Sequence, residues 1–480
     1  MSPTDASAPS PPFSTIPVYV PPMGARPPFQ PTGLTAMMRS SRDLLSNLPV
    51  DAFLWHTKTW DFFGRKIHLF NAPDLVREVF VARNAAFERK SPQQLTAFEP
   101  LIGDGLLVSD GETWRHRRAA VGPIVHGRNV PAFVPGMVEA ALEWRARWQL
   151  FADAGRPVDV VHEMGCLTAE IISRSIFGRT LGIEHTGEIA AAFARYQEVA
   201  DQLALAEMLR LPSWVPRPGR LGPAREARRI HRIIDAIIDD RIEARSGGDG
   251  DEGCLIDRLF DAKDETGRPL DREAIRNEAM VIFLAGHETT ANTLSWAFFL
   301  LSQAGWARAA LHAEVDEALA GGPPDNAGIA ALTYTRAVVE ETLRLYPPIP
   351  LIAREAVEDA TVGDTHVAKG SLVLALPWLI HRHPHLWWRA PDFIPERFLP
   401  GETRPRKDQY LPFALGPRVC PGMTFGLVEA TLCLAVLSHA FELEPLQGTR
   451  VEPVCRLTLK PGNSLPMMVR ARRQEAGAAA

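Results

Sequence analysis

The chain has 480 residues, of which 46% are hydrophobic and 23% charged, and its formal net charge at pH 7 is -5. This ordinary composition and slight acidic excess argue against a nucleic acid as partner. The five cysteines are odd in number and scattered, which excludes a disulfide framework and predicts free thiols in a reducing compartment. We therefore expect a cytoplasmic protein.

The N-terminal segment is rich in proline and small residues. It shows neither the charged and apolar regions of a signal peptide nor a spanning segment, so we expect no export and no membrane anchor. No composition break divides the rest of the chain, although the length alone would allow about three domains. The prediction is a disordered segment at 1–30, a single domain at 31–470 and a disordered tail at 471–480.

The first regular elements are expected near residue 55. Alternation of apolar and polar residues from Trp55 to His68 predicts a β-hairpin, and Pro73 opens a short helix. Residues 91–111 are predicted to be a loop, and a helix is expected to start near Glu112.

That helix carries a tryptophan and an arginine on one face. Trp114 and Arg118 are four residues apart, so their side chains are neighbours on the helix surface. Both side chains donate hydrogen bonds and could together reach an anionic group. The alternative is a solvated basic face with one core tryptophan.

From residue 131 to residue 245 the pattern is helical. It is interrupted at 211–219, where three prolines end one helix and delay the next. This break could be an ordinary loop between helices or a substrate lid. A polar run at 247–253 predicts a flexible connector.

A long apolar helix is predicted over 281–301. The window is long enough to span a membrane, but Glu288 and other polar residues at its centre favour a buried helix of a soluble protein. Ala285 and Thr289 share a face, and Gly286 would allow a flat ligand to approach or the helix to open locally. A buried carboxylate is costly, so Glu288 is a candidate functional residue; the alternative is a kink held by threonine hydroxyl groups.

Further polar pairs follow this helix. Glu341 and Arg344 lie three apart on a helix, with Arg397 in a later Pro-Glu-Arg-Phe stretch. The residues from Ile349 to Arg354 predict a strand that could line a pocket. Alternate histidines at 381, 383 and 385 can chelate a metal, and an ordinary polar turn is the alternative.

The most specific pattern is Phe-Ala-Leu-Gly-Pro-Arg-Val-Cys-Pro-Gly, from Phe413 to Gly422, followed by an apolar helix. Helix-terminal N–H groups and Arg418 would favour a thiolate at Cys420. No second cysteine or histidine stands at the spacing of a zinc site, so a single axial thiolate to haem iron fits best. A buried free cysteine is the alternative.

This stretch resembles the haem-binding loop of the cytochrome P450 superfamily, F-x-x-G-x-R-x-C-x-G, at every specified position, and the other motifs stand in the family's order. The resemblance covers about residues 50–470 and is strongest to soluble, bacterial-type haem-thiolate monooxygenases. It implies a mainly α fold with a smaller β-rich lobe (α+β), with a long central helix over haem b (iron protoporphyrin IX).

The resemblance also implies roles for individual residues. Cys420 would be the axial iron ligand, with Phe413, Arg418 and Gly422 in its loop, and Trp114, Arg118 and Arg354 would bind the haem propionates. Thr289 would hydrogen-bond the dioxygen being activated and Glu288 would relay protons. Glu341, Arg344 and Arg397 would form a buried structural network. The substrate pocket would include Leu107, Ala285, Ile349 and Leu351.

The function implied is that of an oxidoreductase acting on paired donors, with incorporation of one oxygen atom of O2 into an apolar molecule such as a fatty acid, alkane or terpenoid. The sequence has no nucleotide-binding or iron–sulfur motif, so electrons must come from a ferredoxin with its reductase or from a flavoprotein. Arginines at 115, 117, 118, 404 and 406 and Lys407 could form a docking face for it. We expect a monomer. Alternatives are a peroxide-driven peroxygenase, an isomerase of hydroperoxides, or a non-catalytic haem or ligand sensor.

Overall fold

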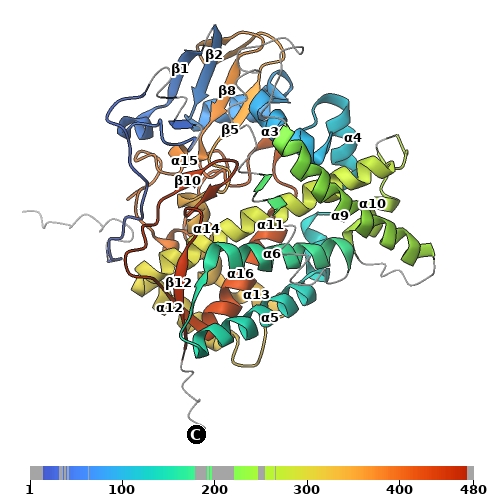
Figure 1. The fold of residues 1–480 in the computed structure, drawn as a ribbon. Helices are drawn as coiled ribbons and strands as arrows, with labels where there is room; N and C mark the ends of the chain where they lie inside the picture. The colour runs from blue at the N-terminus through green and yellow to red at the C-terminus, as the bar shows by residue number, and fades with distance from the viewer. Residues whose placement is uncertain are drawn as a thin grey trace, which may run out of the picture.

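The computed structural model describes residues 15–31, 36, 39–40, 43–62, 64–178, 192–193, 195–196, 221–246, 254–264 and 266–472. A body of helices adjoins a smaller lobe that holds a five-stranded sheet (Figure 1). The predicted mainly α architecture with a smaller β-rich lobe is therefore confirmed. The predicted break at 211–219 and the connector at 247–253 lie outside the described residues.

The described helices are α2 (Pro73–Arg77), α3 (Pro92–Ile102), α4 (Gly111–Val121), α5 (Val134–Asp153), α6 (Val160–Phe177), α9 (Leu221–Ser246), α10 (Leu255–Asp261), α11 (Arg272–Gln303), α12 (Gly305–Ala318), α13 (Asn326–Ala331), α14 (Thr333–Leu345), α15 (Pro377–Ile380) and α16 (Met423–Ala440). Short helical turns are η1 (Val50–Leu54), η2 (Glu78–Ala82), η3 (Asn84–Phe87), η4 (Gly127–Ala132), η6 (Pro395–Phe398) and η7 (Gly416–Arg418).

The strands are β1 (Thr57–Phe62), β2 (Arg65–Phe70), β3 (Arg89–Lys90), β4 (Pro157–Asp159), β5 (Ile352–Glu355), β6 (Ala360–Val362), β7 (Thr365–Val367), β8 (Leu372–Ala375), β9 (Phe441–Pro445), β10 (Val454–Cys455), β11 (Leu459–Lys460) and β12 (Pro466–Ala471). The largest sheet has the order β1-β2-β8-β5-β3, with β2 and β8 parallel and the other pairs antiparallel. The smaller sheets are β4-β12-β9, β10-β11 and β6-β7.

The predicted hairpin is formed by β1 and β2. Thr57 pairs with Phe70 and Phe62 pairs with Arg65 across the ladder. Gly64 occupies the turn with a φ of 78°, a left-handed conformation that glycine adopts without a steric penalty. The short helix at Pro73 and the helix near Glu112 are also present, as α2 and α4.

The long central helix is α11, which extends the predicted window at both ends. It crosses the helical body and packs against α6, α14 and α16 (Figure 1). Gly286 faces α6, where an added Cβ atom would lie 2.8 Å from Cδ1 of Ile172. This glycine therefore permits the close packing of two helices, and its role toward a ligand stays a prediction.

One of the two predictions of irregular structure is wrong in part. Much of the supposed loop at 91–111 is α3, which Ser91 caps through a bond from the N–H of Gln94 and which Pro92 begins. The part of the N-terminal segment described by the structure, residues 15–31, is extended and packed on the domain. Its carbonyl group at Tyr19 accepts the N–H of Phe393, for example.

One described helix, α16, is long and apolar enough to cross a membrane, with a mean hydropathy of 1.5. It is 67% buried within the protein, between α5, α11, α12 and α14. The core helix of a globular protein has the same properties, so this one helix is weak evidence for a membrane span.

Candidate functional site

The cysteine loop is held by backbone geometry on the N-terminal side of α16. The N–H of Cys420 donates to the carbonyl oxygen of Phe413 at 2.9 Å, which closes the loop. Gly416 has a φ of 73°, and an added Cβ atom would lie 2.1 Å from the carbonyl oxygen of Phe80. No other residue fits there. The loop consequently presents the sulfur atom from a rigid support three residues before Met423, the start of α16.

The ionisation of this cysteine differs from the prediction. Burial raises the pKa of Cys420 above its ordinary value, and a hydrogen bond from the Gly422 N–H group and the charge of Arg118 oppose that effect. The predicted contribution of Arg418 is not among the causes. Because the balance favours the thiol, the thiolate would require a bound metal cation to stabilise it.

A group of cations lies beside this loop. Its members are Lys90 and Arg354, which are buried, and Arg118 and Arg418, which are partly buried. Arg354 is 2% exposed and Lys90 is 8% exposed, although charged side chains are rarely buried without a counter-charge. No ion pair joins any of the four to a carboxylate in the part of the chain that the structure describes. The group is therefore a candidate site for an anionic ligand.

The hydrogen bonds of Arg354 and Arg418 support this interpretation. Arg354 donates to the carbonyl oxygen of Ala353 at 2.8 Å, and Arg418 donates to those of Ser109 at 2.8 Å and Glu88 at 3.3 Å. The Nε atoms of both arginines are buried and lack a partner. The guanidinium of Arg418 also stacks 4.1 Å from the ring centre of Trp114, which brings α4 to the site.

The cations also repel one another. Burial, with a smaller contribution from Arg418, lowers the pKa of Arg354 to about 9. Burial lowers the pKa of Arg418 to about 10, while the charges of Glu88 and Asp110 oppose this effect and Arg118 adds a smaller repulsion. Burial, then Arg354 and Arg418, lower the pKa of Lys90 well below its ordinary value. An anion bound among them would reverse these shifts, because it would stabilise every charged form.

Away from its two ends, the central helix is accessible at one place. Between Asn277 and Leu301 every residue is buried except Ala285, Gly286 and Thr289. Ala285 and Thr289 lie one turn apart on the same face. The Thr289 hydroxyl group donates to the Ala285 carbonyl oxygen at 2.6 Å. At this turn the helix therefore exposes two small residues and one threonine.

The Glu288 carboxylate contacts the segment around β11, away from the accessible face of α11. Its Oε1 atom accepts a hydrogen bond from the Thr458 hydroxyl group at 2.6 Å and forms an ion pair with Lys460 at 3.2 Å. Asn292 donates to Thr458 at 3.0 Å. The carboxylate is 7% exposed, so these partners from the segment around β11 offset the cost of burying its charge.

The comparisons with known proteins decide the family. The family model for cytochrome P450 matches residues 54–465. The chain is a cytochrome P450. Its heme-domain fold agrees with a solved structure, the heme domain of cytochrome P450DA, at a TM-score of 0.78 and 26% identity, over 94% of this chain and 99% of that chain.

Three relatives illustrate the range of similar P450s. A cyclooctatin synthase from Streptomyces melanosporofaciens is 34% identical, over 89% of this chain and 90% of its own. A cytokinin hydroxylase from Arabidopsis thaliana is 31% identical over 86% and 82%, respectively. A cyclooctat-9-en-7-ol 5-monooxygenase from the same Streptomyces species is 29% identical over 91% and 92%. Membership of the cytochrome P450 family and the match to a solved heme domain confirm the predicted haem b cofactor.

The described residues fit haem. Its two propionate carboxylates supply the negative charge that the cation group lacks, and Cys420 supplies the sulfur ligand for the iron. Lys90 is a member that sequence reasoning missed. It stands on a two-residue strand, β3, and its only sequence signal is that it precedes the N-terminal cap of α3. The register of β3 against β5 places it opposite Arg354.

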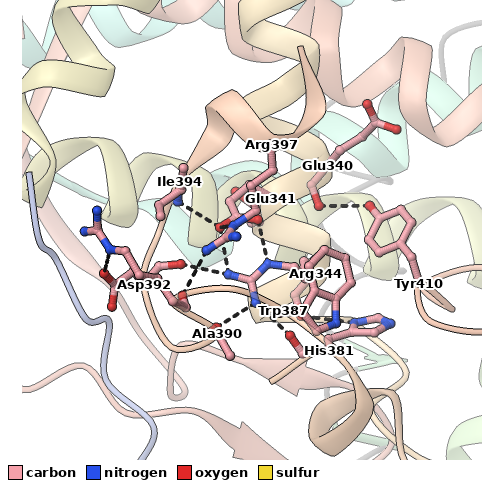
Figure 2. Close-up of polar contacts among 12 residues, drawn as sticks. Glu340, Glu341, Arg344, His381, Trp387, Ala390, Asp392, Ile394, Arg397 and Tyr410 are labelled. Atoms are coloured by element: carbon pink, nitrogen blue, oxygen red, sulfur yellow. Dashed lines mark hydrogen bonds and ion pairs between the residues drawn. The ribbon is translucent and has the colours of Figure 1, made fainter. Parts of the chain in front are cut away.

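The predicted Glu-Arg-Arg set is brought together in the P450 (Figure 2). Arg344 donates from Nε to Glu341 at 2.6 Å and from a terminal nitrogen at 2.7 Å. Glu341 also accepts the N–H of Ile394 at 2.8 Å and lies 3.5 Å from Nε of Arg397. Glu341 and Arg344 are fully buried, so this is an ion pair inside the core.

Three backbone carbonyl groups complete the arginine's partners. Arg344 donates to the carbonyl oxygens of His381, Ala390 and Asp392, each at 2.7 Å. These residues lie on the irregular segment that follows α15. One guanidinium group therefore fixes α14 to a long segment without regular secondary structure, as Figure 2 shows.

The predicted substrate residues are all accessible to some extent. Leu107 and Leu351 are partly buried, Ala285 is exposed on α11, and Ile349 is 37% exposed. The strand predicted from Ile349 is β5, and it begins at Ile352. Their role in substrate binding stays a prediction.

The predicted basic docking face is largely neutralised. Arg117 forms an ion pair with Asp104 and lies 3.6 Å from Glu278, Arg404 pairs with Glu340, and Arg406 pairs with Asp74 and Asp408. Arg118 is partly buried and interacts with Cys420. Arg115 and Lys407 are exposed. The sequence could not reveal this pairing, because most of the carboxylates are distant along the chain.

Proposed function

We propose that this P450 is a haem-thiolate monooxygenase that hydroxylates or epoxidises an apolar small molecule. The reaction consumes O2, two protons and two electrons; one oxygen atom enters the substrate and the other leaves as water. The electrons come from an external donor, either a ferredoxin with its reductase or a flavoprotein. We propose a cytoplasmic monomer with one domain at 31–470.

The observation that carries this proposal is the accessible Thr289 hydroxyl group next to the buried Glu288 carboxylate on α11. When bound, the haem supplies the oxidising chemistry, and an axial thiolate favours O–O cleavage. The chain's task is to deliver protons and to keep other water out. A sensor of oxygen or ligands needs no such acid and hydroxyl pair, and a peroxygenase receives its oxygen already reduced.

The proton route begins at the carboxylate of Glu288. Lys460 and the Thr458 hydroxyl group hold its Oε1 atom, and this hydroxyl group can pass a proton while it remains hydrogen-bonded. Thr289 Oγ1 is the last donor, because it lies on the accessible face of the helix. Its present bond to the Ala285 carbonyl oxygen would be exchanged for one to dioxygen in the pocket.

The haem would be held by the cysteine loop and the cation group. Cys420 would bind the iron, and Phe413 and Gly422 shape the loop around it. Trp114, Arg118, Arg354 and Arg418, which come from α4, β5 and the cysteine loop, would bind the propionates, and we add Lys90 to them. The buried pair of Glu341 and Arg344, with Arg397, would keep the segment after α15 in place.

The substrate that we favour is a terpenoid or another largely hydrocarbon molecule, with fatty acids and alkanes next. Leu107, Ala285, Ile349 and Leu351 would offer it aliphatic surface. One relative is named for the synthesis of cyclooctatin and another for the oxygenation of cyclooctat-9-en-7-ol at carbon 5. A Soret-band titration of the ferric protein with compounds of each class would identify the class that displaces an axial water.

The decisive test replaces Thr289 by alanine and measures product and hydrogen peroxide per electron pair consumed. We expect product yield to fall and peroxide to rise, because protons no longer reach the correct oxygen atom. Thr293→Ala is the matched control, since its hydroxyl group makes the same bond one turn later, to the Thr289 carbonyl oxygen at 2.8 Å. Unchanged coupling in Thr289→Ala would refute the proton role. Full activity with peroxide and none with a reductase would establish the peroxygenase instead.

A further inference from the structure

A second group of ligand atoms lies among residues outside the haem site. His56, His383 and His385 place ring nitrogen atoms within 4.8 Å of one another. His56 immediately precedes β1, and the other two follow α15, so distant parts of the chain meet here. His381 is not a member, because it bonds to the carbonyl oxygen of Arg344 and the N–H of Leu411.

The middle histidine is fixed and buried. His383 is 4% exposed, and its Nε2 atom is buried and without a hydrogen-bond partner. Its ring meets that of His56 edge-on, with centroids 5.0 Å apart, and lies 5.2 Å from that of His385. The other ring nitrogen, Nδ1, accepts the N–H of His385 at 3.2 Å, so Nε2 alone lacks a partner. A buried polar nitrogen without a partner is costly in a folded protein, and its position in a histidine cluster indicates a ligand.

The backbone around the cluster is anchored on both sides. The carbonyl oxygen of His56 accepts the N–H groups of Asn71 and Ala72 at 2.8 and 3.2 Å. The carbonyl oxygen of His383 accepts those of Leu386 and Trp387 at 3.0 and 3.1 Å. Only the rings of the two exposed histidines, His56 and His385, need to move to close a site.

We propose that His56, His383 and His385 form a binding site for Zn2+. Neutral imidazole is a preferred zinc ligand, and three histidines leave a fourth tetrahedral position for water. Zn–N distances of about 2.0–2.1 Å imply that the ligand nitrogens lie about 3.3 Å from one another. These nitrogens now lie within 4.8 Å of one another, so the rings must move closer to bind zinc. The exposed rings can do so by rotation.

The guanidinium group of the neighbouring Arg382 does not occupy the histidine site. Arg382, adjacent to His383, stacks its guanidinium on the ring of Trp378, 3.7 Å from the ring centre. The bound metal would join the start of β1, at the edge of the five-stranded sheet, to the segment after α15. The site is therefore structural in position and lies on residues that the monooxygenase proposal does not use.

The experiment is a calorimetric titration of ZnCl2 into the tag-free, haem-loaded protein, with metal content measured after equilibrium dialysis. We expect one zinc ion per chain with a micromolar dissociation constant. Loss of an outer partner of a metal ligand already costs about 10–100-fold in affinity, so His56→Gln and His385→Gln should each weaken binding at least about tenfold. His366→Gln, an exposed histidine on β7, should have no effect.

The two exposed positions keep the test decisive even if His383→Gln fails to fold. Absence of binding at micromolar concentration would overturn the proposal. Equal affinity in wild type and in either exposed-histidine variant would overturn the three-ligand site as well. Mg2+, which prefers oxygen ligands, should not compete with zinc.

Discussion

The buried pair of Glu341 and Arg344 should be the most sensitive point of the fold outside the haem site. Both side chains are fully buried. Glu341→Gln keeps the shape of the side chain but removes the negative charge, which leaves Arg344 and the nearby Arg397 without a carboxylate. Breaking a buried pair by removing one partner costs about 3–5 kcal/mol.

A second variant tests the geometry at constant charge. Arg344 donates five hydrogen bonds, two to Glu341 and three to backbone carbonyl oxygens. Lysine has three donors, so Arg344→Lys leaves at least two buried acceptors unsatisfied, at about 1–3 kcal/mol each. The expected loss is about 2–6 kcal/mol, and haem content should fall with it.

The assay is urea unfolding followed by far-ultraviolet circular dichroism and, separately, by Soret absorbance. Glu273→Gln is the matched control, because Glu273 pairs with Arg276 at the same spacing on α11 but is 74% exposed. Its loss should stay below about 0.5 kcal/mol. If Glu341→Gln shifts the midpoint no further than Glu273→Gln, the reasoning about buried charge is refuted.

Three further outcomes are expected. Burial raises the pKa of Glu278 to about 8, against the opposing charge of Arg117, so the native state holds an extra proton between about pH 4.5 and 8 and stability falls as pH rises through that window. Glu278→Gln should flatten this fall in urea midpoints, and parallel curves would contradict it. Lys90→Met should lower the haem reduction potential and speed haem transfer to an acceptor protein, whereas Lys66→Met, on the exposed surface, should change neither. Burial raises the pKa of Glu429 well above its ordinary value, so the native state holds a proton there at neutral pH that the unfolded state releases. Glu429→Gln removes this penalty and should raise the urea midpoint at neutral pH; a lower midpoint would show that the carboxylate is charged.

Local patterns in the sequence predicted much of the fold because they express local physics. Alternation specified the hairpin of β1 and β2, and the apolar pattern specified α11 and α16. The loop predicted at 91–111 failed although Ser91 and Pro92 are a helix start signal. Pro100, which lies inside α3, argues against a helix because proline removes a backbone donor there.

The parts of the site that escaped prediction depend on distant contacts. Lys90 is buried because β3 pairs with β5, and no residue near it in sequence indicates that pairing. Gly286 was read from its helix alone, while its packing role comes from Ile172 on α6. The alternate histidines could be recognised as candidate ligands from the sequence. Their third partner, His56, could not be, because no motif surrounds it.

The cation group links haem binding to the stability of the lobe that carries the sheet. Arg354 belongs to β5 and Lys90 to β3, whereas Arg418 belongs to the cysteine loop next to α16. Lys90 is repelled by Arg354 and Arg418, and Arg354 is repelled by Arg418. Two propionate carboxylates would turn that repulsion into attraction between the sheet and the helical body. Haem would therefore act as a structural bridge between the two parts of the fold, in addition to carrying the chemistry.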